Sequence, residues 1–180
     1  MNYEDTLGSV MFDEETIAKR VAELGAQISA DYEREYPGEE VICVTILKGG
    51  AVFASDLLRR LTVDARIDFM AVSSYGSSTK SSGVVKIIKD LDTDIQGKNV
   101  LIMEDIIDSG VTLNFLVENF WDRGPKSIKI CTFLNKPARR RVDLVPEYIG
   151  FDIENRFIVG YGLDYDEKYR NLPYITCLDE

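Results

Sequence analysis

The chain has 180 residues, the size of one ordinary domain and too short for two full enzyme domains. Hydrophobic residues make up 45% and charged residues 29% of it, which supports a buried core and argues against disorder. The formal net charge of −10 gives little general attraction for nucleic acid, and the absence of histidine excludes histidine-based triads, dyads and zinc sites.

Helix patterns occur at three places along the chain. The first is capped by Asp13 and broken by Pro37, with apolar residues at helical spacing between them. The second covers residues 51–61. The third carries apolar residues up to Trp121 and is broken by Gly124.

Strand patterns, short and rich in apolar and β-branched residues, alternate with these helices. They cover residues 41–47, 65–74, 84–89, 99–104, 127–134, 148–153, 157–159 and 174–177. Residues 75–83 are small and polar, a composition typical of a mobile loop. The alternation predicts an α/β domain with a largely parallel sheet flanked by helices, in which ligands bind at the carboxyl ends of the strands.

The cysteines and the first residues of the sequence indicate where in the cell the protein is expected. Cys43 and Cys131 lie inside apolar runs, and Cys177 lies near the end, so buried free thiols are expected. Such thiols suit a reducing cytoplasm. We expect neither a targeting peptide, because residues 1–11 carry acids and no basic cluster, nor a membrane span, because no apolar run approaches roughly 20 residues.

The most informative stretch is NVLIMEDIIDSGVTL. A buried strand delivers two adjacent carboxylates, Glu104 and Asp105, to its carboxyl end, and a third carboxylate follows at Asp108. Small and hydroxyl residues then lead into a helix, where backbone N–H groups can converge on an anion. This predicts a cup for a phosphate monoester, beside carboxylates that could hold sugar hydroxyls and a divalent cation. On spacing alone, the alternative is an ordinary turn with Asp108 as helix cap.

The segment VLIMEDIIDSGVTL resembles the phosphoribosyl-pyrophosphate motif of the type I phosphoribosyltransferases. Within them it most resembles the 6-oxopurine branch, the hypoxanthine-guanine phosphoribosyltransferases. The resemblance continues, in the family's order, through VICVTILKGG, SSYGSSTKSSG, TFLNKPARR and FIVGYGLDYDEKYRNLPY. Ser109 stands where threonine is commoner, and Val111 occupies a variable position. The resemblance implies the type I phosphoribosyltransferase fold in a single domain, with a small purine-side hood from the chain ends, mainly residues 135–180.

The activity implied by the resemblance is purine salvage. Phosphoribosyl passes from 5-phosphoribosyl 1-diphosphate to N9 of hypoxanthine or guanine, with xanthine as a further candidate, giving IMP or GMP plus pyrophosphate. Mg²⁺ is the implied cofactor, and a homo-oligomer, dimer or tetramer, the implied assembly. A lid over about residues 74–83, opened by Ser74 and Tyr75, would shut water away from the sugar cation.

The resemblance also implies roles for single residues. Glu104 and Asp105 hold the ribose hydroxyls, directly or through Mg²⁺, and Asp108 accepts the purine N7 proton. Asp164 is implied as a second magnesium ligand. The 5-phosphate is gripped by Asp108, Ser109, Gly110, Val111 and Thr112. Pyrophosphate is held by Lys48, Gly49 and Arg170, and the family has a non-proline cis peptide before this lysine.

The purine side depends on a second group of residues. Lys136 is implied to donate to the 6-oxygen, and an ammonium, which has donors only, favours a 6-oxo base over adenine. Phe157 stacks on the base, and the backbone of Ile158 reads the purine edge. Asp164 lies on the same side.

Alternative interpretations remain open at this point. The same fold and motif occur in nucleotide-sensing regulators that bind RNA, but these need a broad basic face, which a charge of −10 does not suggest. The arginine run at 139–141 is expected to be a solvated face or a support of the pocket. An enzyme of this fold that uses another base would require Lys136 and Phe157 to be misassigned. The run of Asp90, Asp92 and Asp94 lacks the glycine of a calcium loop and is interpreted as a turn.

Overall fold

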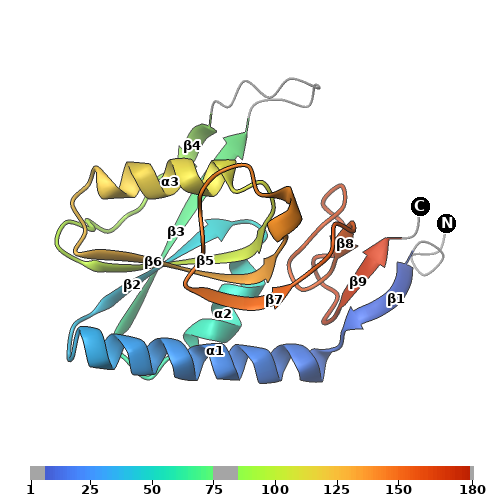
Figure 1. The fold of residues 1–180 in the computed structure, drawn as a ribbon, viewed down its shortest axis with the longest axis horizontal. Helices are drawn as coiled ribbons and strands as arrows, with labels where there is room; N and C mark the ends of the chain where they lie inside the picture. The colour runs from blue at the N-terminus through green and yellow to red at the C-terminus, as the bar shows by residue number, and fades with distance from the viewer. Residues whose placement is uncertain (1–6, 75–84, 179–180) are drawn as a thin grey trace.

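The structure, a computed structural model, describes residues 7–74 and 85–178. Its larger sheet has the strand order β4 (Val85–Lys89), β3 (Ala65–Ser74), β2 (Val41–Leu47), β5 (Asn99–Ile107), β6 (Ser127–Asn135) and β7 (Tyr148–Asp152). A smaller sheet has the order β1 (Leu7–Phe12), β9 (Ile175–Leu178) and β8 (Ile158–Val159) (Figure 1). Strands β3, β2, β5, β6 and β7 are mutually parallel, and edge strand β4 is antiparallel, which confirms the predicted fold class.

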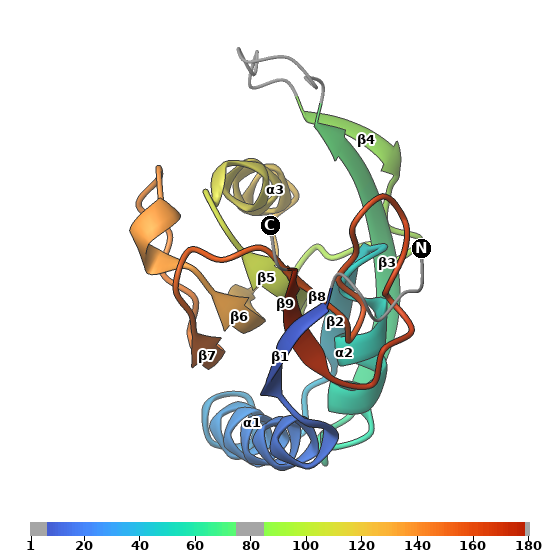
Figure 2. The same cartoon turned by 90° about the vertical axis from the view of Figure 1, so that its right-hand side faces the viewer.

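Helices cover both faces of the larger sheet. Helices α1 (Glu14–Glu35) and α2 (Ala51–Leu58) pack on one face, and α3 (Val111–Trp121) packs on the other (Figure 2). Asp13 caps α1 as expected, because its carboxylate accepts the amide of Thr16 at 2.8 Å. With both faces covered, the central strands β2 and β5 can be apolar along most of their length, and this explains their unbroken hydrophobic runs.

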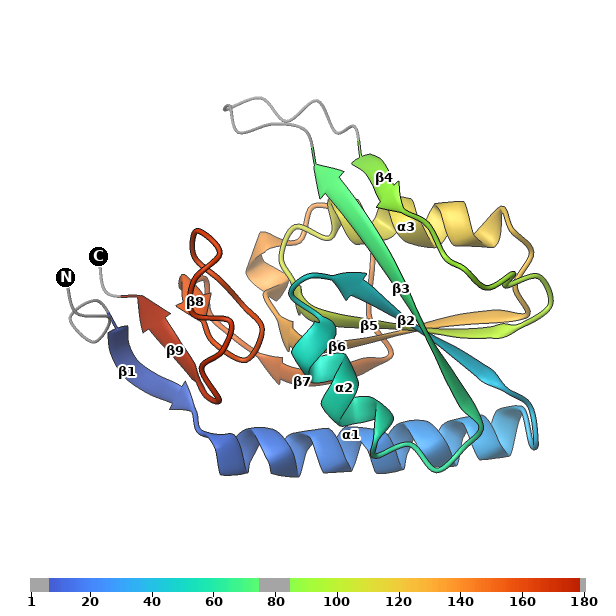
Figure 3. The same ribbon diagram turned by 180° about the vertical axis from the view of Figure 1, so that it is seen from behind.

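The order of the strands places a topological switch between β2 and β5. From β2 the chain passes to β3 on one side, and after β4 it returns to β5 on the other side (Figure 3). Because ligands of open α/β sheets bind where the strand order reverses, the carboxyl ends of β2 and β5 are the expected position of a site. These are the two strands that the sequence motifs follow.

Three features differ from the sequence expectations. Strand β1 was not expected, and it pairs antiparallel with β9 at the far end of the chain, Leu7 opposite Leu178. Strand β5 continues to Ile107 rather than ending at Glu104, because β6 pairs with it along that length. Helix α2 ends at Leu58, where the chain tightens into a turn. The three cysteines are free and buried, as expected.

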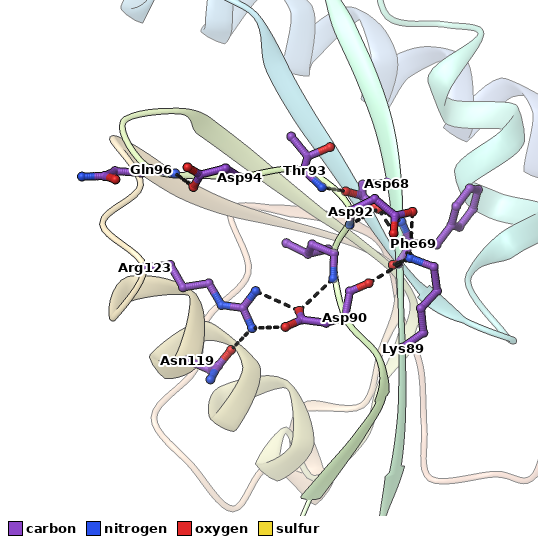
Figure 4. Close-up of polar contacts among 11 residues, drawn as sticks. Asp68, Phe69, Lys89, Asp90, Asp92, Thr93, Asp94, Gln96, Asn119 and Arg123 are labelled. Carbon is purple, nitrogen blue, oxygen red and sulfur yellow. Dashed lines mark hydrogen bonds and ion pairs between the residues drawn. The ribbon is translucent and has the colours of Figure 1, made fainter.

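The acidic run before β5 is a structural turn (Figure 4). Asp68 of β3, only 4% exposed, accepts the backbone amides of Phe69, Asp92 and Thr93. Asp90 binds the guanidinium of Arg123 at 2.8 and 3.1 Å, and Asp94 accepts the amide of Gln96. Within residues 7–74 and 85–178 no three carboxylate, thiol or imidazole side chains gather as a metal cluster. No helix of that part is long and apolar enough to cross a membrane.

Candidate active site

The loop after β2 touches the end of β5. Leu47 and Lys48 are joined by a cis peptide bond, at the position that the resemblance implied. Gly49 lies directly against Asp105, since a Cβ atom on Gly49 would stand 1.9 Å from Asp105 Oδ2. Only glycine therefore allows the backbone of this loop to approach the carboxylate so closely.

The two adjacent carboxylates of β5 form an acidic pair with high proton affinity. Burial raises the pKa of Asp105 to about 6, against a backbone amide bond from Ile106 that lowers it. Burial and the neighbouring Asp105 raise the pKa of Glu104 well above its usual range. A shared cation stabilises the charged form of two desolvated carboxylates on consecutive residues. Mg²⁺ is held by one or two carboxylates together with water and substrate oxygens, so these donors fit it.

Asp164, the third expected magnesium ligand, lies close to this acidic pair but is engaged elsewhere. Its charge raises the pKa of Asp105, whereas that of Arg170 lowers it, so both side chains are within electrostatic reach. Asp164 Oδ1 lies 2.9 Å from Arg170 Nη2, and Oδ2 accepts the amide of Glu167. The described residues contain no three-carboxylate cluster at this point, so Asp164 stays a predicted ligand.

A cavity of about 160 Å³ opens between the end of β5 and the start of α3. It is lined by Glu104, Ile106, Ile107, Asp108, Ser109, Gly110, Thr112 and Leu113. Gly110 caps α3 with a φ of 79°, a left-handed conformation that favours glycine. The amides of Ser109 and Gly110 donate to no acceptor among the described residues. The cavity therefore has the form of the predicted phosphate cup.

Four of the five expected cup residues line this cavity, and Val111 does not. The amide of Val111 instead points back to Ser109 Oγ at 3.4 Å. Backbone amides without an acceptor at the start of a helix form a suitable anion site.

Two arginines of the run at 139–141 hold the cup in place. Arg140 Nη1 donates to the backbone carbonyl of Asp108 at 2.9 Å, and Nη2 donates to Asn135 Oδ1. A Cβ atom on Gly110 would meet Arg140 Cδ at 3.0 Å, so the arginine also packs over the cup's backbone. Arg139 Nε lies 2.6 Å from Asp108 Oδ1, as an ion pair without hydrogen-bond alignment. The run at 139–141 thus supports the pocket, one of its two expected roles, and its position after β6 beside β5 was the only signal.

The purine-side residues also come together. Lys136 is buried, with 7% of the residue exposed. Its ammonium donates a hydrogen bond to the backbone carbonyl of Arg156, the residue before Phe157. Burial lowers the pKa of Lys136, and the charge of Asp108 opposes that effect, so this lysine is within reach of the cup. Ile158 of β8 pairs with Cys177 of β9, and among the described residues β8 is an edge strand with one free side.

An aromatic residue that the sequence reasoning missed stands beside them. Phe157 is 55% exposed, and its ring meets that of Tyr165 edge to face, with centroids 5.5 Å apart. An exposed aromatic pair of this kind offers a ring face on which a flat group can stack. Tyr165 carried no functional signal in the sequence.

The residues expected to hold pyrophosphate meet across two loops. Arg170 Nη1 donates to the carbonyl of Gly162 at 2.8 Å. A Cβ atom on Gly162 would stand 2.4 Å from the carbonyl oxygen of Gly49, so the late loop packs against the one that follows β2. Lys48 and Arg170 both form ion pairs with Glu167. Ser74 ends β3, whereas Tyr75 and the rest of the expected lid lie outside the described residues.

Comparison with known proteins agrees with this geometry. The sequence profile of the family described as "Phosphoribosyl transferase domain" matches residues 11–166. The chain is 51% identical to a hypoxanthine-guanine phosphoribosyltransferase of Mycobacterium tuberculosis over 98% of this chain and 89% of that protein. It is 52% identical to that of Bacillus subtilis, over 94% and 92%.

Solved structures give the same result. A hypoxanthine-guanine phosphoribosyltransferase of Bacillus anthracis superimposes with a TM-score of 0.89 at 50% identity, covering 96% of this chain and 99% of that one. A hypoxanthine phosphoribosyltransferase of Staphylococcus aureus gives 0.92 at 48% identity, covering 98% and 94%. The chain therefore belongs to the phosphoribosyltransferase family, in its hypoxanthine-guanine branch.

Proposed function

We propose that this purine salvage enzyme transfers phosphoribosyl from 5-phosphoribosyl 1-diphosphate to N9 of hypoxanthine or guanine and releases pyrophosphate. The observation that supports this reaction is the cavity at the end of β5, which is flanked by an acidic pair and by Asp108. The names of the relatives agree with the reaction. No observation favours the RNA-binding alternative, and a charge of −10 opposes it.

The 5-phosphate is bound in the cup at the start of α3. The unengaged amides of Ser109 and Gly110, with the hydroxyl of Thr112, supply donors to its oxygens. Arg140 keeps the cup in shape through the Asp108 carbonyl, so it acts as a positioning residue. The ribose then lies over Glu104 and Asp105, which accept hydrogen bonds from its hydroxyls.

The acidic pair would also hold Mg²⁺, with Asp164 as a further ligand. When bound, Mg²⁺ supplies positive charge that stabilises the leaving pyrophosphate. Without such a cation, a polyanionic substrate would face two carboxylates of raised pKa. The chain itself adds the cations of Lys48 and Arg170 and the backbone of Gly49 on the pyrophosphate side.

The base is oriented by donors and an aromatic surface. The Lys136 ammonium donates to the 6-oxygen, and Phe157, backed by Tyr165, stacks on the ring. The backbone of Ile158, on the free side of edge strand β8, reads the purine edge.

Bond breaking at C1′ gives pyrophosphate the electron pair of the carbon–oxygen bond, and the new bond forms from N9. Asp108 takes the proton that leaves N7 as N9 attacks, so charge does not accumulate on the base. A lid over about residues 74–83 would keep water from the sugar cation.

We also propose a cytoplasmic location, from the three buried thiols, and a homo-oligomer, from the family. A study of the Trypanosoma cruzi enzyme, 38% identical to this chain, concerns how its C-terminal region affects oligomeric state. In this chain the last described strand is β9, which pairs with β1.

Initial rates with hypoxanthine, guanine, xanthine and adenine, each with 5-phosphoribosyl 1-diphosphate and Mg²⁺, test the proposal. We expect nucleotide formation from hypoxanthine and guanine and none from adenine, because Lys136 offers donors only. Preference for adenine would overturn the role of Lys136. Absence of product from every base would overturn the proposed reaction.

A further inference from the structure

A tight turn in the late loop places a glutamate in an unfavourable conformation. The backbones of Tyr165 and Lys168 exchange hydrogen bonds of 3.2 and 3.1 Å around Asp166 and Glu167. Both central residues are left-handed, with φ of 50° and 63°. Two-residue turns of this kind favour asparagine, aspartate or glycine, and a long side chain is disfavoured at the second position. Glu167 is therefore held there by contacts that the turn itself does not provide.

Those contacts are made by the carboxylate of Glu167. Its Oε2 lies 2.8 Å from Lys48 Nζ, and its Oε1 lies 3.4 Å from Arg170 Nη2. The hydrogen bond from Lys48 is the main cause that lowers the pKa of Glu167, so the carboxylate is charged at neutral pH. One anion thus bridges two cations that come from loops more than a hundred residues apart in sequence.

Lys48 and Arg170 are also the two cations that the proposed function assigns to pyrophosphate. A carboxylate and a phosphoryl group both present oxygen acceptors that share negative charge, and both suit these donors. The ion pair with Lys48 is exposed, 68% for the lysine and 63% for the glutamate, so a dissolved anion can reach it. Because exposed ion pairs are weak, a multiply charged diphosphate would exchange with it readily.

We propose that Glu167 is a positioning residue that occupies the pyrophosphate site of the substrate-free enzyme and is displaced by the diphosphate of the substrate. The inference rests on the proposed function, because it requires Lys48 and Arg170 to bind that group. Before substrate arrives, Glu167 holds both cations near their working places. After reaction it competes with pyrophosphate for them and so favours release of the product.

The test compares Glu167→Gln with the matched control Asp166→Asn. Both remove one negative charge from the same turn, but Asp166 has no ion pair with Lys48 or Arg170 among the contacts of the described residues. Calorimetric titration with pyrophosphate and Mg²⁺ at fixed ionic strength gives the dissociation constant of each variant. We expect Glu167→Gln to bind pyrophosphate about fivefold more tightly than the wild type, and Asp166→Asn to stay within about twofold.

Steady-state kinetics give a second readout. The KM for 5-phosphoribosyl 1-diphosphate should fall with Glu167→Gln, while the KM for hypoxanthine, bound on the far side of the site, should stay unchanged. Glu167→Gly, which relieves the left-handed residue, should also bind pyrophosphate more tightly, because it removes the same carboxylate. Equal affinity of Glu167→Gln and Asp166→Asn, or weaker binding by Glu167→Gln, would overturn the inference in an enzyme that is otherwise active. A wild type that forms no nucleotide and binds no pyrophosphate would overturn the proposed function as well.

Discussion

Replacement of Asp108 by asparagine separates chemistry from binding at this site. The amide has the size of the carboxylate but cannot accept the purine N7 proton. If Asp108 is the general base, turnover should fall by about 10²- to 10⁴-fold. The cup should survive, because Arg140 is bound to the backbone carbonyl of Asp108 and not to its side chain.

The structural cost of this change is small. The side chains of Asp108 and Arg139 are 43% and 45% exposed, and an ion pair so open to solvent contributes about 1 kcal/mol or less. We therefore expect thermal unfolding within about 4 °C of the wild type, since 1 kcal/mol shifts Tm by about 2–4 °C in chains of this size. Affinity for 5-phosphoribosyl 1-diphosphate should stay within about threefold, because only this weak pair is lost.

The assay is single-turnover nucleotide formation from hypoxanthine, beside calorimetric binding of 5-phosphoribosyl 1-diphosphate. Arg139→Gln is the matched control, because it breaks the same ion pair and leaves the carboxylate. Its rate should stay within about fivefold of the wild type, the size of one exposed ion pair. An Asp108→Asn enzyme within about threefold of wild-type turnover would refute the proton-transfer role. An equal loss in both variants would assign the effect to the ion pair instead.

Three further results are expected. Gly49→Ala should abolish turnover while the chain stays folded, as judged by circular dichroism, because its Cβ would stand 1.9 Å from Asp105 Oδ2; an alanine enzyme of normal rate would contradict the contact. Chelation of divalent ions should stop the reaction reversibly, since the acidic pair and the substrate repel each other; full turnover in excess chelator would refute the bridging cation. Burial raises the pKa of Asp68, but the amides of Thr93, Phe69 and Asp92 hold it below its ordinary value of 3.8. Its contribution to stability is thus present above pH 3.8 and lost as the pH falls through the folded value, so Asp68→Asn should lower Tm at pH 7, with a gap that closes in acid. Melting curves with an unchanged gap at low pH would contradict this.

The sequence predicts those parts of the molecule whose pattern is local. The unbroken apolar run of β2, the cap at Asp13 and the acidic pair near the end of a buried strand each contain their own signal, and the structure has each of them. Strand β1 lacks such a signal. Its six residues, LGSVMF, show no clear alternation, and pairing with β9 stabilises it from the opposite end of the chain.

The missed parts of the site depend on long-range contacts. An exposed arginine or glutamate has many partners available to it, so sequence alone cannot assign Arg140 to the Asp108 carbonyl or Glu167 to Lys48. The sequence also predicted that β5 ends at Glu104. Pairing of Ile107 with Asn135 extends β5 across that segment, and the cup still begins at Asp108.

The two halves of the site differ in when a growing polypeptide can build them. Strands β2, β5 and β6 and helix α3, which frame the acidic pair and the cup, lie within a continuous middle stretch of the chain. Phe157 and Ile158, at the start of β8, follow this stretch in sequence, and β9, which pairs with β8, also pairs with β1 near the other end of the described residues. The aromatic surface for the base is therefore translated after the strands that frame the acidic pair and the cup.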